Sequence, residues 1–222
     1  MTADRFRALG ALADPVRRSV YEYVTAQDLA VGREQVAGAL AIPGHTARFH
    51  LERLVEEGLL RTERRRLSGR TGPGAGRPAK LYRRAEVEVS VSLPAREYDL
   101  VGSILAAAAA RALDGRSLEK GLRAEARSRG RAAGEAFTGV GGEARRMSDA
   151  LAEHGYEPVV EDDGLVMRNC PFDSLAREEP QLVCGINRDF VDGMVDGLGC
   201  TATRAVLDPS PGRCCVRVQT AS

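Results

Sequence analysis

The feature that most constrains the fold is a helix-length apolar pattern over residues 43–57, which a long basic loop soon follows. Proline and glycine open the segment and Gly58 ends it, as these residues commonly do at helix boundaries. The apolar side chains recur every three to four residues and share one face: Ala47, Leu51, Leu54 and Val55. The remaining positions are polar, charged or aromatic: His45, Thr46, Arg48, Phe49, Glu52 and Arg53. The pattern therefore predicts a helix with one buried face and one face free to contact a partner.

Two short strands are predicted on either side of the basic loop. Residues 59–62 form the first strand and residues 80–84 the second, and the loop over 64–78 is rich in arginine and glycine. Residues 61–84 contain nine Lys and Arg against a single acidic residue, Glu63. Such an excess of positive charge attracts phosphate groups, although most charged runs are only solvated surface. Its position directly after the amphipathic helix favours contact with nucleic acid.

The residues before this helix predict three more helices, over 4–12, from 15 onward and over 34–41. Asp14 and Pro15 form a helix-start signal, with the aspartate as N-cap and the proline at the first helical position. The core positions predicted on these helices are Val16, Val20, Tyr23, Val24, Val36, Ala37 and Leu40. Helices followed by strand, loop and strand predict a winged helix-turn-helix DNA-binding domain over residues 1–90.

The remainder of the chain mixes helices and strands, so the predicted fold class is α+β. Residues 86–93 alternate valine with polar residues and predict an exit strand or a linker. Helices are predicted over 95–114, 118–137, 143–154 and 182–198, and strands over 156–161, 165–169, 201–207 and 214–219, of which the first two form a hairpin turned by residues 162–164. We expect a helical linker or dimerisation segment over 91–140 and an α+β sensor domain over 141–222. The first two of these helices carry small residues, which suit close helix packing and a dimer seam equally well.

Composition limits the class of protein. With 222 residues, of which 43% are hydrophobic, the chain can form two ordinary domains. Residues 1–90 contain 16 Lys and Arg against 11 Asp and Glu, whereas residues 91–222 contain 16 against 20. No apolar run is long enough to span a membrane and the N-terminus lacks a signal-peptide pattern, which predicts a cytoplasmic protein with no membrane partner.

The sequence offers little for catalysis. The three histidines, His45, His50 and His154, are too scattered for an obvious acid–base set. No glycine loop that binds phosphate follows a predicted strand, and no nucleophile motif is present. We therefore do not expect an enzyme.

All five cysteines lie between Cys170 and Cys215. No CxxC motif is present, so metal ligands would have to come from separate elements. Thiolates assembled in this way could hold an iron–sulfur cluster or a zinc ion, and the alternative is that the cysteines are small buried hydrophobic residues. In a reducing compartment we expect free, metal-bound or redox-active cysteines rather than structural disulfides. Adjacent Cys214 and Cys215 would alternate on a strand, so only one of them is expected in any one pocket.

Two sets of motifs carry a resemblance to a known family. Gly-Arg-Pro-Ala-Lys-Leu-Tyr at residues 76–82 resembles the wing of one branch of the ArsR-type winged-helix repressors. Asn-Cys-Pro-Phe-Asp-Ser-Leu-Ala at 169–176, with residues 180–184 and 211–214, resembles the same branch, the SufR-like regulators. Some of these regulators carry an oxygen-labile 4Fe-4S cluster and repress iron–sulfur assembly operons. The resemblance covers nearly the whole chain and implies Cys170, Cys184 and Cys214 as cluster ligands, with Cys200 and Cys215 both open for a fourth position.

These features together predict a sequence-specific transcriptional regulator. We expect a homodimeric repressor that binds a double-stranded DNA operator, with the helix over 43–57 in the major groove. The predicted DNA-binding residues are His45, Thr46, Arg48, Phe49, Arg53, Arg64, Arg65, Arg66, Arg70, Arg77 and Lys80. His50 and Tyr82 are expected to have packing roles instead. A cluster held by the C-terminal cysteines is expected to modulate DNA affinity, and the alternative is a structural zinc or small-ligand site without a cluster.

Overall fold

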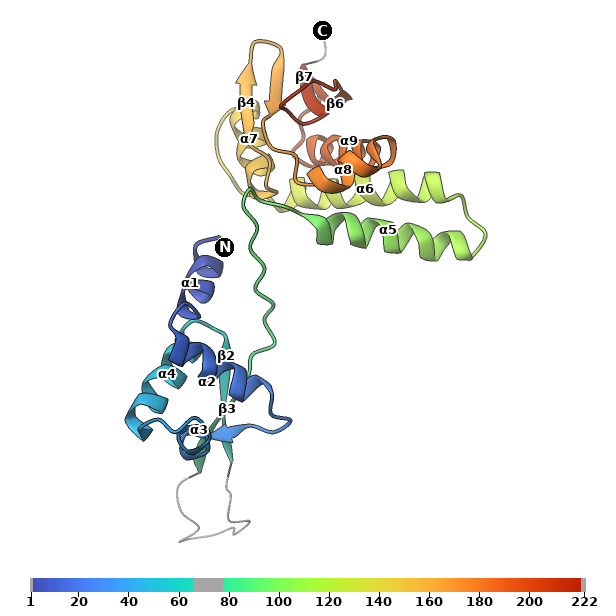
Figure 1. Ribbon diagram of the computed structural model, residues 1–222. Helices are drawn as coiled ribbons and strands as arrows, with labels where there is room; N and C mark the ends of the chain where they lie inside the picture. Colours follow the sequence, from blue (N-terminus) through green and yellow to red (C-terminus); the bar gives the residue numbers. More distant parts are fainter. Residues whose placement is uncertain (1, 66–77, 221–222) are drawn as a thin grey trace. The chain divides into compact units, whose positions relative to one another are not determined.

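The computed structural model describes residues 2–65 and 78–220 of the chain. It divides the chain into two compact units, Met1–Val91 and Ser92–Ser222, and each unit has its own hydrophobic core (Figure 1). The helices that the sequence predicts over 91–140 belong to the second unit rather than to a segment of their own.

In the described part of the N-terminal unit, residues 2–65 and 78–91, four helices pack with a small antiparallel sheet. The strand order in this sheet is β1-β3-β2. The elements in chain order are α1 (Thr2–Ala11), α2 (Pro15–Thr25), β1 (Val31–Gly32), α3 (Arg33–Ala39), α4 (Gly44–Glu56), β2 (Leu60–Arg65) and β3 (Ala79–Arg84). This arrangement confirms the predicted winged helix-turn-helix order, with α4 at the position of the expected reading helix.

Local sequence signals explain where these helices begin and end. The carboxylate of Asp14 accepts a hydrogen bond from the backbone N–H of Arg17 at 2.9 Å, which caps α2 as predicted. Gly58 has φ 71°, a left-handed conformation that favours glycine and ends α4. Val20 and Val24 are buried in the core as predicted, whereas Val16 is 37% exposed, so its predicted core position is wrong.

The C-terminal unit combines five helices with a four-stranded antiparallel sheet of order β4-β5-β7-β6. Within the unit, α9 packs against α6 on one side and against β6 and β7 on the other (Figure 1). The elements are α5 (Tyr98–Leu113), α6 (Leu118–Ala136), α7 (Glu143–Glu153), β4 (Pro158–Glu161), β5 (Gly164–Met167), α8 (Asp173–Glu178), α9 (Pro180–Gly197), β6 (Thr203–Leu207) and β7 (Val216–Thr220). The sequence did not predict α8, and no strand forms over 86–93, which is a linker.

Helices α6 and α9 approach each other closely through glycines. A Cβ atom added to Gly193 of α9 would lie 2.1 Å from the carbonyl oxygen of Arg127 on α6. A Cβ atom added to Gly130 of α6 would lie 1.9 Å from the carbonyl oxygen of Phe190 on α9. Backbone atoms cannot rotate away as side chains can, so only glycine fits at these positions. The small residues of α6 therefore serve packing inside the unit.

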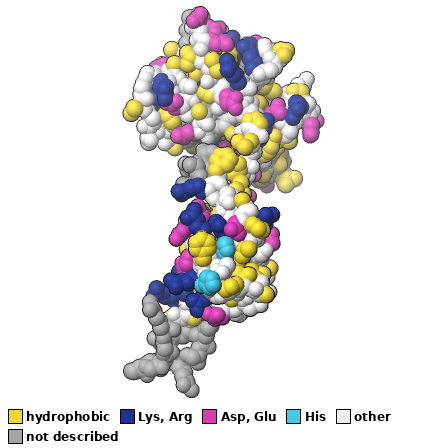
Figure 2. Space-filling view, turned by 60° about the vertical axis from the view of Figure 1, so that its left-hand side comes forward, with side chains coloured by type: hydrophobic (Ala, Val, Ile, Leu, Met, Phe, Trp, Pro, Cys, Tyr) yellow, Lys and Arg dark blue, Asp and Glu magenta, His cyan; other side chains and the backbone are white. Residues whose placement is uncertain are grey.

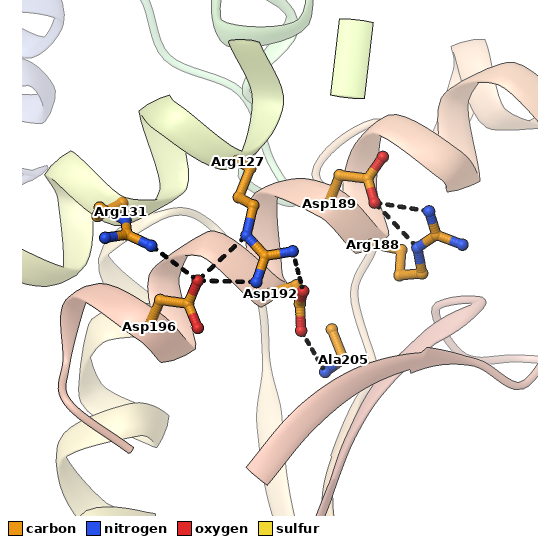
Figure 3. A network of polar contacts seen from close by, with 7 residues as sticks. All are labelled: Arg127, Arg131, Arg188, Asp189, Asp192, Asp196 and Ala205. Carbon is orange, nitrogen blue, oxygen red and sulfur yellow. Dashed lines mark hydrogen bonds and ion pairs between the residues drawn. The ribbon is translucent and has the colours of Figure 1, made fainter. Parts of the chain in front are cut away.

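Ion pairs flank this glycine contact (Figure 3). The guanidinium of Arg127 lies 2.9 Å from the carboxylate of Asp192 and 2.8 Å from that of Asp196, and Arg131 also pairs with Asp196 at 3.1 Å. The second oxygen of Asp192 accepts a hydrogen bond from the backbone N–H of Ala205 on β6 at 3.3 Å. One aspartate thus connects α9 to both α6 and the edge of the sheet.

Within residues 2–65 and 78–220, no helix has the length and hydropathy needed to cross a bilayer.

Candidate DNA interface and cysteine cavity

Helix α4 has the two faces that its sequence predicts. Ala47, Leu51 and Leu54 are fully buried, because they form part of the core of the N-terminal unit. On the other face His45, Arg48 and Phe49 are exposed, and Phe49 retains 63% of its accessible surface. Figure 2 shows Lys and Arg side chains gathered beside histidine side chains on this unit. The exposed face of α4 therefore combines hydrogen-bonding, cationic and aromatic groups.

The predicted DNA-binding residues differ in how they are already engaged. Arg48 makes no hydrogen bond or ion pair with any residue that the structure describes, and its guanidinium is available to a partner. Arg53 instead pairs with Glu56 and Glu57 on its own helix. Thr46 is half-buried. The charge of Arg53 is therefore largely compensated within α4.

The strands of the wing carry exposed arginines. Arg64 and Arg65 on β2 are exposed, and neither has an ion-pair partner among the described parts of the chain. Strands β2 and β3 pair from Leu60 opposite Arg84 to Arg65 opposite Ala79, as predicted. Three further predicted phosphate contacts lie outside the described residues: Arg66, Arg70 and Arg77.

Lys80 has a structural partner that the sequence did not predict. Its Nζ lies 2.6 Å from a carboxylate oxygen of Glu52 on α4, and the hydroxyl of Tyr82 donates to the same carboxylate at 2.7 Å. The hydrogen bond from Lys80 lowers the pKa of Glu52, while burial and the bond to Glu52 raise the pKa of Tyr82. The predicted packing role of Tyr82 is confirmed, since this side chain is only 3% exposed. Lys80 thus attaches β3 to the reading helix and is only partly available to phosphate.

His50 lies on the core side of α4 and is 6% exposed. Burial lowers its pKa below the ordinary histidine value, so the imidazole is neutral near pH 7. Its ring packs edge-on against the ring of Phe49 at a centroid distance of 5.2 Å. The expected packing role of His50 is confirmed.

The C-terminal unit brings four of the five cysteines to one cavity of about 410 Å³. Cys170 follows β5, Cys184 lies on α9, and Cys214 and Cys215 directly precede β7. The charged residues that line this cavity beside the cysteines are Asp173, Arg177 and Arg213. Cys200 does not line it and is buried after the end of α9. Of the two residues considered for a fourth ligand position, the structure therefore places Cys215 with the other three.

Two expectations for these cysteines are corrected. Cys184 and Cys215 form a disulfide with a Cα–Cα distance of 6.4 Å, although free, metal-bound or redox-active cysteines were expected rather than a structural disulfide. Cys214 and Cys215 line the same cavity, because β7 begins only at Val216 and strand alternation does not apply to them. Among the described residues, no group of three or more His, Cys, Asp and Glu side chains is arranged to hold a metal ion.

The two remaining cavity thiols form an unequal pair. A hydrogen bond from Cys170 lowers the pKa of Cys214 to about 7, and the same interaction, with burial, raises the pKa of Cys170. The side-chain amide of Asn187 also donates to the Cys214 sulfur at 3.2 Å. Cys214 is therefore the thiol of the pair that ionises more readily, with Cys170 as its hydrogen-bond donor.

The sequence did not predict a buried series of hydrogen bonds that runs from Tyr156 through Asn187 to Cys214. Asn187 is fully buried on α9, and its carbonyl oxygen accepts a hydrogen bond from the hydroxyl of Tyr156. Burial raises the pKa of Tyr156 well above its ordinary value, so the phenol remains a donor. An asparagine among apolar residues of a predicted helix was the available signal, because a buried amide requires partners.

Comparison with known proteins identifies the N-terminal unit. Residues 12–63 match the family model described as a helix-turn-helix domain. The chain contains a helix-turn-helix domain. This domain supports a DNA-binding transcriptional regulator and agrees with the exposed face of α4. No curated protein and no solved structure matches the chain.

Proposed function

We propose that this helix-turn-helix protein is a homodimeric, sequence-specific transcriptional repressor of the SufR-like type. The observation that supports this most is the exposed Arg48 on the outer face of α4, which has no ion-pair partner in the described ranges 2–65 and 78–220 and lies within the residues that match the helix-turn-helix model. A helix of this kind enters the major groove, where an arginine can bind guanine through two hydrogen bonds. His45 and Thr46 lie on the same first turns of α4 and would contact neighbouring bases.

The wing would contribute affinity rather than sequence specificity. Arg64 and Arg65 are exposed on β2 and would bind phosphates, together with Arg66, Arg70 and Arg77, which lie outside the described residues. Lys80 would hold α4 at a fixed angle to the wing through Glu52. A dimer would repeat these contacts on two half-sites, since a single reading helix contacts few bases.

We further propose that the cysteine cavity is the sensor and that it holds an iron–sulfur cluster. The donor set fits by type, because Cys170, Cys184, Cys214 and Cys215 line one cavity and thiolates are the usual cluster ligands. Cys184 can serve only after its disulfide to Cys215 is reduced, since a ligand sulfur must be a thiolate. A cluster bound there would supply a group sensitive to oxygen and to redox state.

The residues of this chain would prepare the site in two ways. Asn187 holds the Cys214 sulfur by a hydrogen bond, and Tyr156 in turn fixes the amide of Asn187. Hydrogen bonds to a ligand sulfur orient it and adjust its basicity. The alternative is a structural zinc or small-ligand site, and the same four cysteines would also suit zinc once the disulfide is reduced.

Two measurements test the proposal. Fluorescence anisotropy of the full-length protein with the duplex upstream of its own gene should show affinity that falls steeply with salt concentration. Absence of salt-dependent affinity for any duplex would refute the DNA-binding function. Iron, sulfide and zinc analysis of anaerobically purified protein then separates the sensors: iron and sulfide support a cluster, and zinc alone supports the alternative.

A further inference from the structure

The segment through which the chain enters the C-terminal unit contacts the turn that carries Cys170, one of the residues lining the cysteine cavity. Residues 92–97 continue the linker that begins at residue 86, and they connect it to α5; the word linker refers to residues 92–97 below. The backbone N–H of Glu97 donates to the carbonyl oxygen of Pro171 at 3.1 Å. Pro171 follows Cys170, a cysteine that lines the cavity. The turn that contains Cys170 and Pro171 therefore contacts the cavity through Cys170 and the linker through Pro171.

Arg96 makes most of the contacts between the linker and the turn that contains Cys170. Its guanidinium donates to the side-chain oxygen of Asn169 and, at 3.1 Å, to the carbonyl oxygen of Cys170. It also lies 3.6 Å from the carboxylate of Asp173, at the start of α8. The Arg96 side chain is only 17% exposed, so water competes weakly for these bonds. One residue of the linker thus holds both ends of the Cys170 turn.

Asn169 completes the attachment from the other direction. This residue is 7% exposed, and its amide donates to the carbonyl oxygens of Ala95, at 3.0 Å, and of Gly155. A further hydrogen bond, 2.9 Å long, joins the hydroxyl of Ser174 to that of Tyr98 on the first turn of α5. Two of the hydrogen bonds of the Asn169 side chain, those with Ala95 and Arg96, therefore join the turn to the linker, and the one to Gly155 ties the turn to the end of α7.

From this geometry we infer that Arg96 is a positioning residue that couples the cysteine cavity to the linker of the DNA-binding unit. Cys170 presents its sulfur to the cavity and its carbonyl oxygen to Arg96, so a displacement of this residue must change the contacts of the linker. No other element intervenes in this path. The inference rests on the proposed function for its purpose, because it describes how a change at the sensor reaches the DNA-binding unit.

Coupling of this kind acts in both directions, since two linked equilibria influence each other equally. Release of the linker must therefore loosen the Cys170 turn, just as a change at Cys170 loosens the linker. This reciprocity permits a test that needs neither DNA nor a bound cofactor.

The test compares Arg96→Ala with Arg145→Ala in the full chain. Arg145 is a control for the loss of an arginine–aspartate ion pair, because it pairs with Asp149 on α7 at 2.6 Å and does not line the cysteine cavity. Hydrogen exchange of the Glu97 amide and the labelling rate of Cys170 by N-ethylmaleimide are measured for each variant by mass spectrometry. We expect both rates to rise about tenfold in Arg96→Ala, which loses charge-assisted hydrogen bonds, and less than about twofold in the control.

Three outcomes overturn the inference. They are an unchanged Glu97 exchange rate in Arg96→Ala, faster exchange without faster labelling of Cys170, and equal effects in both variants. If Arg96→Ala does not fold, Arg96→Lys replaces it, because lysine keeps the charge beside Asp173 but lacks the planar fork that reaches several acceptors.

A final arm separates this inference from the proposed function. Alkylation of the cavity thiols with iodoacetamide should change the duplex affinity of the wild-type protein. The ratio of the affinities before and after alkylation should fall to about one in Arg96→Ala. A ratio that persists in Arg96→Ala overturns the coupling. If the wild-type protein binds no duplex, the proposed function fails, and the exchange and labelling rates alone decide the inference.

Discussion

Replacement of Gly193 by alanine is the sharpest test of the C-terminal fold. The new methyl group would start 2.1 Å from the carbonyl oxygen of Arg127, whereas ordinary contacts begin near 3.4 Å. Neither partner can turn aside, because the carbonyl belongs to the backbone of α6. Helices α6 and α9 must therefore move apart, and the ion pairs of Arg127 with Asp192 and Asp196 lengthen with them.

The expected magnitude follows from two opposing effects. Alanine in place of a helical glycine stabilises by about 0.5–1 kcal/mol when space is available. Insertion of a methyl group into a filled contact costs about 1–3 kcal/mol, and this contact lies at the severe end. We therefore expect Gly193→Ala to lower the free energy of unfolding by about 2 kcal/mol, which corresponds to a melting temperature roughly 4–8 °C lower.

The control lies on the same helix. Gly185 of α9 has no atom within 4 Å of the position that a Cβ would occupy, so Gly185→Ala should be neutral or slightly stabilising. Urea unfolding followed by circular dichroism measures both variants, with separate transitions fitted if the two units unfold independently. A Gly193→Ala protein as stable as Gly185→Ala would show that the helices do not pack as described.

The remaining predictions concern the two sites. Arg48→Ala should weaken binding to the specific duplex at least about tenfold and leave binding to non-specific DNA nearly unchanged. Arg65→Ala should weaken binding to both kinds of DNA and flatten the salt dependence. Equal losses of specific and non-specific affinity for the two variants in anisotropy titrations would contradict the assigned roles. Because Lys80 lowers the pKa of Glu52, their contribution to stability is full above the ordinary carboxyl pKa of 4.5 and is lost as pH falls through the lower folded value. Acid unfolding should therefore be less steep below pH 4.5 in Glu52→Gln, and an unchanged profile would exclude this pair as a contributor. Without reductant, the denatured wild-type protein should show three free thiols and Cys184→Ser four, since its former disulfide partner is released; three in both would exclude the described pairing.

The sequence predicted the elements whose signals are local. Helix α4 begins and ends within about one residue of its predicted bounds, because Pro43 and Gly58 mark its ends and its apolar spacing is regular. The hairpin of β4 and β5 was predicted for the same reason, since a short acidic turn followed by Gly164 connects two apolar runs. Exposure of Val16 was missed because helical spacing alone does not say how wide the buried face is.

Contacts between distant residues could not be predicted in this way. Cys184 and Cys215 are separated by 31 residues, and their pairing depends on how α9 packs beside the segment before β7. The ion pair of Lys80 with Glu52 was missed, and Lys80 was predicted only as a phosphate contact, because Glu52 lies 28 residues away on another element. Spacing along a chain reports on one helix or strand, whereas these pairs depend on the tertiary fold.

The aspartate that joins α9 to β6 has a consequence for self-association. In the sheet order β4-β5-β7-β6, the outermost strands are the two where another chain could add by main-chain pairing. Asp192 already occupies the outward amide of Ala205 on one border, and Pro158 at the start of β4 has no amide hydrogen to offer on the other. A strand added from a second copy would therefore lack an amide donor at Ala205 on one border and at Pro158 on the other, and the new ladder would be interrupted at these positions.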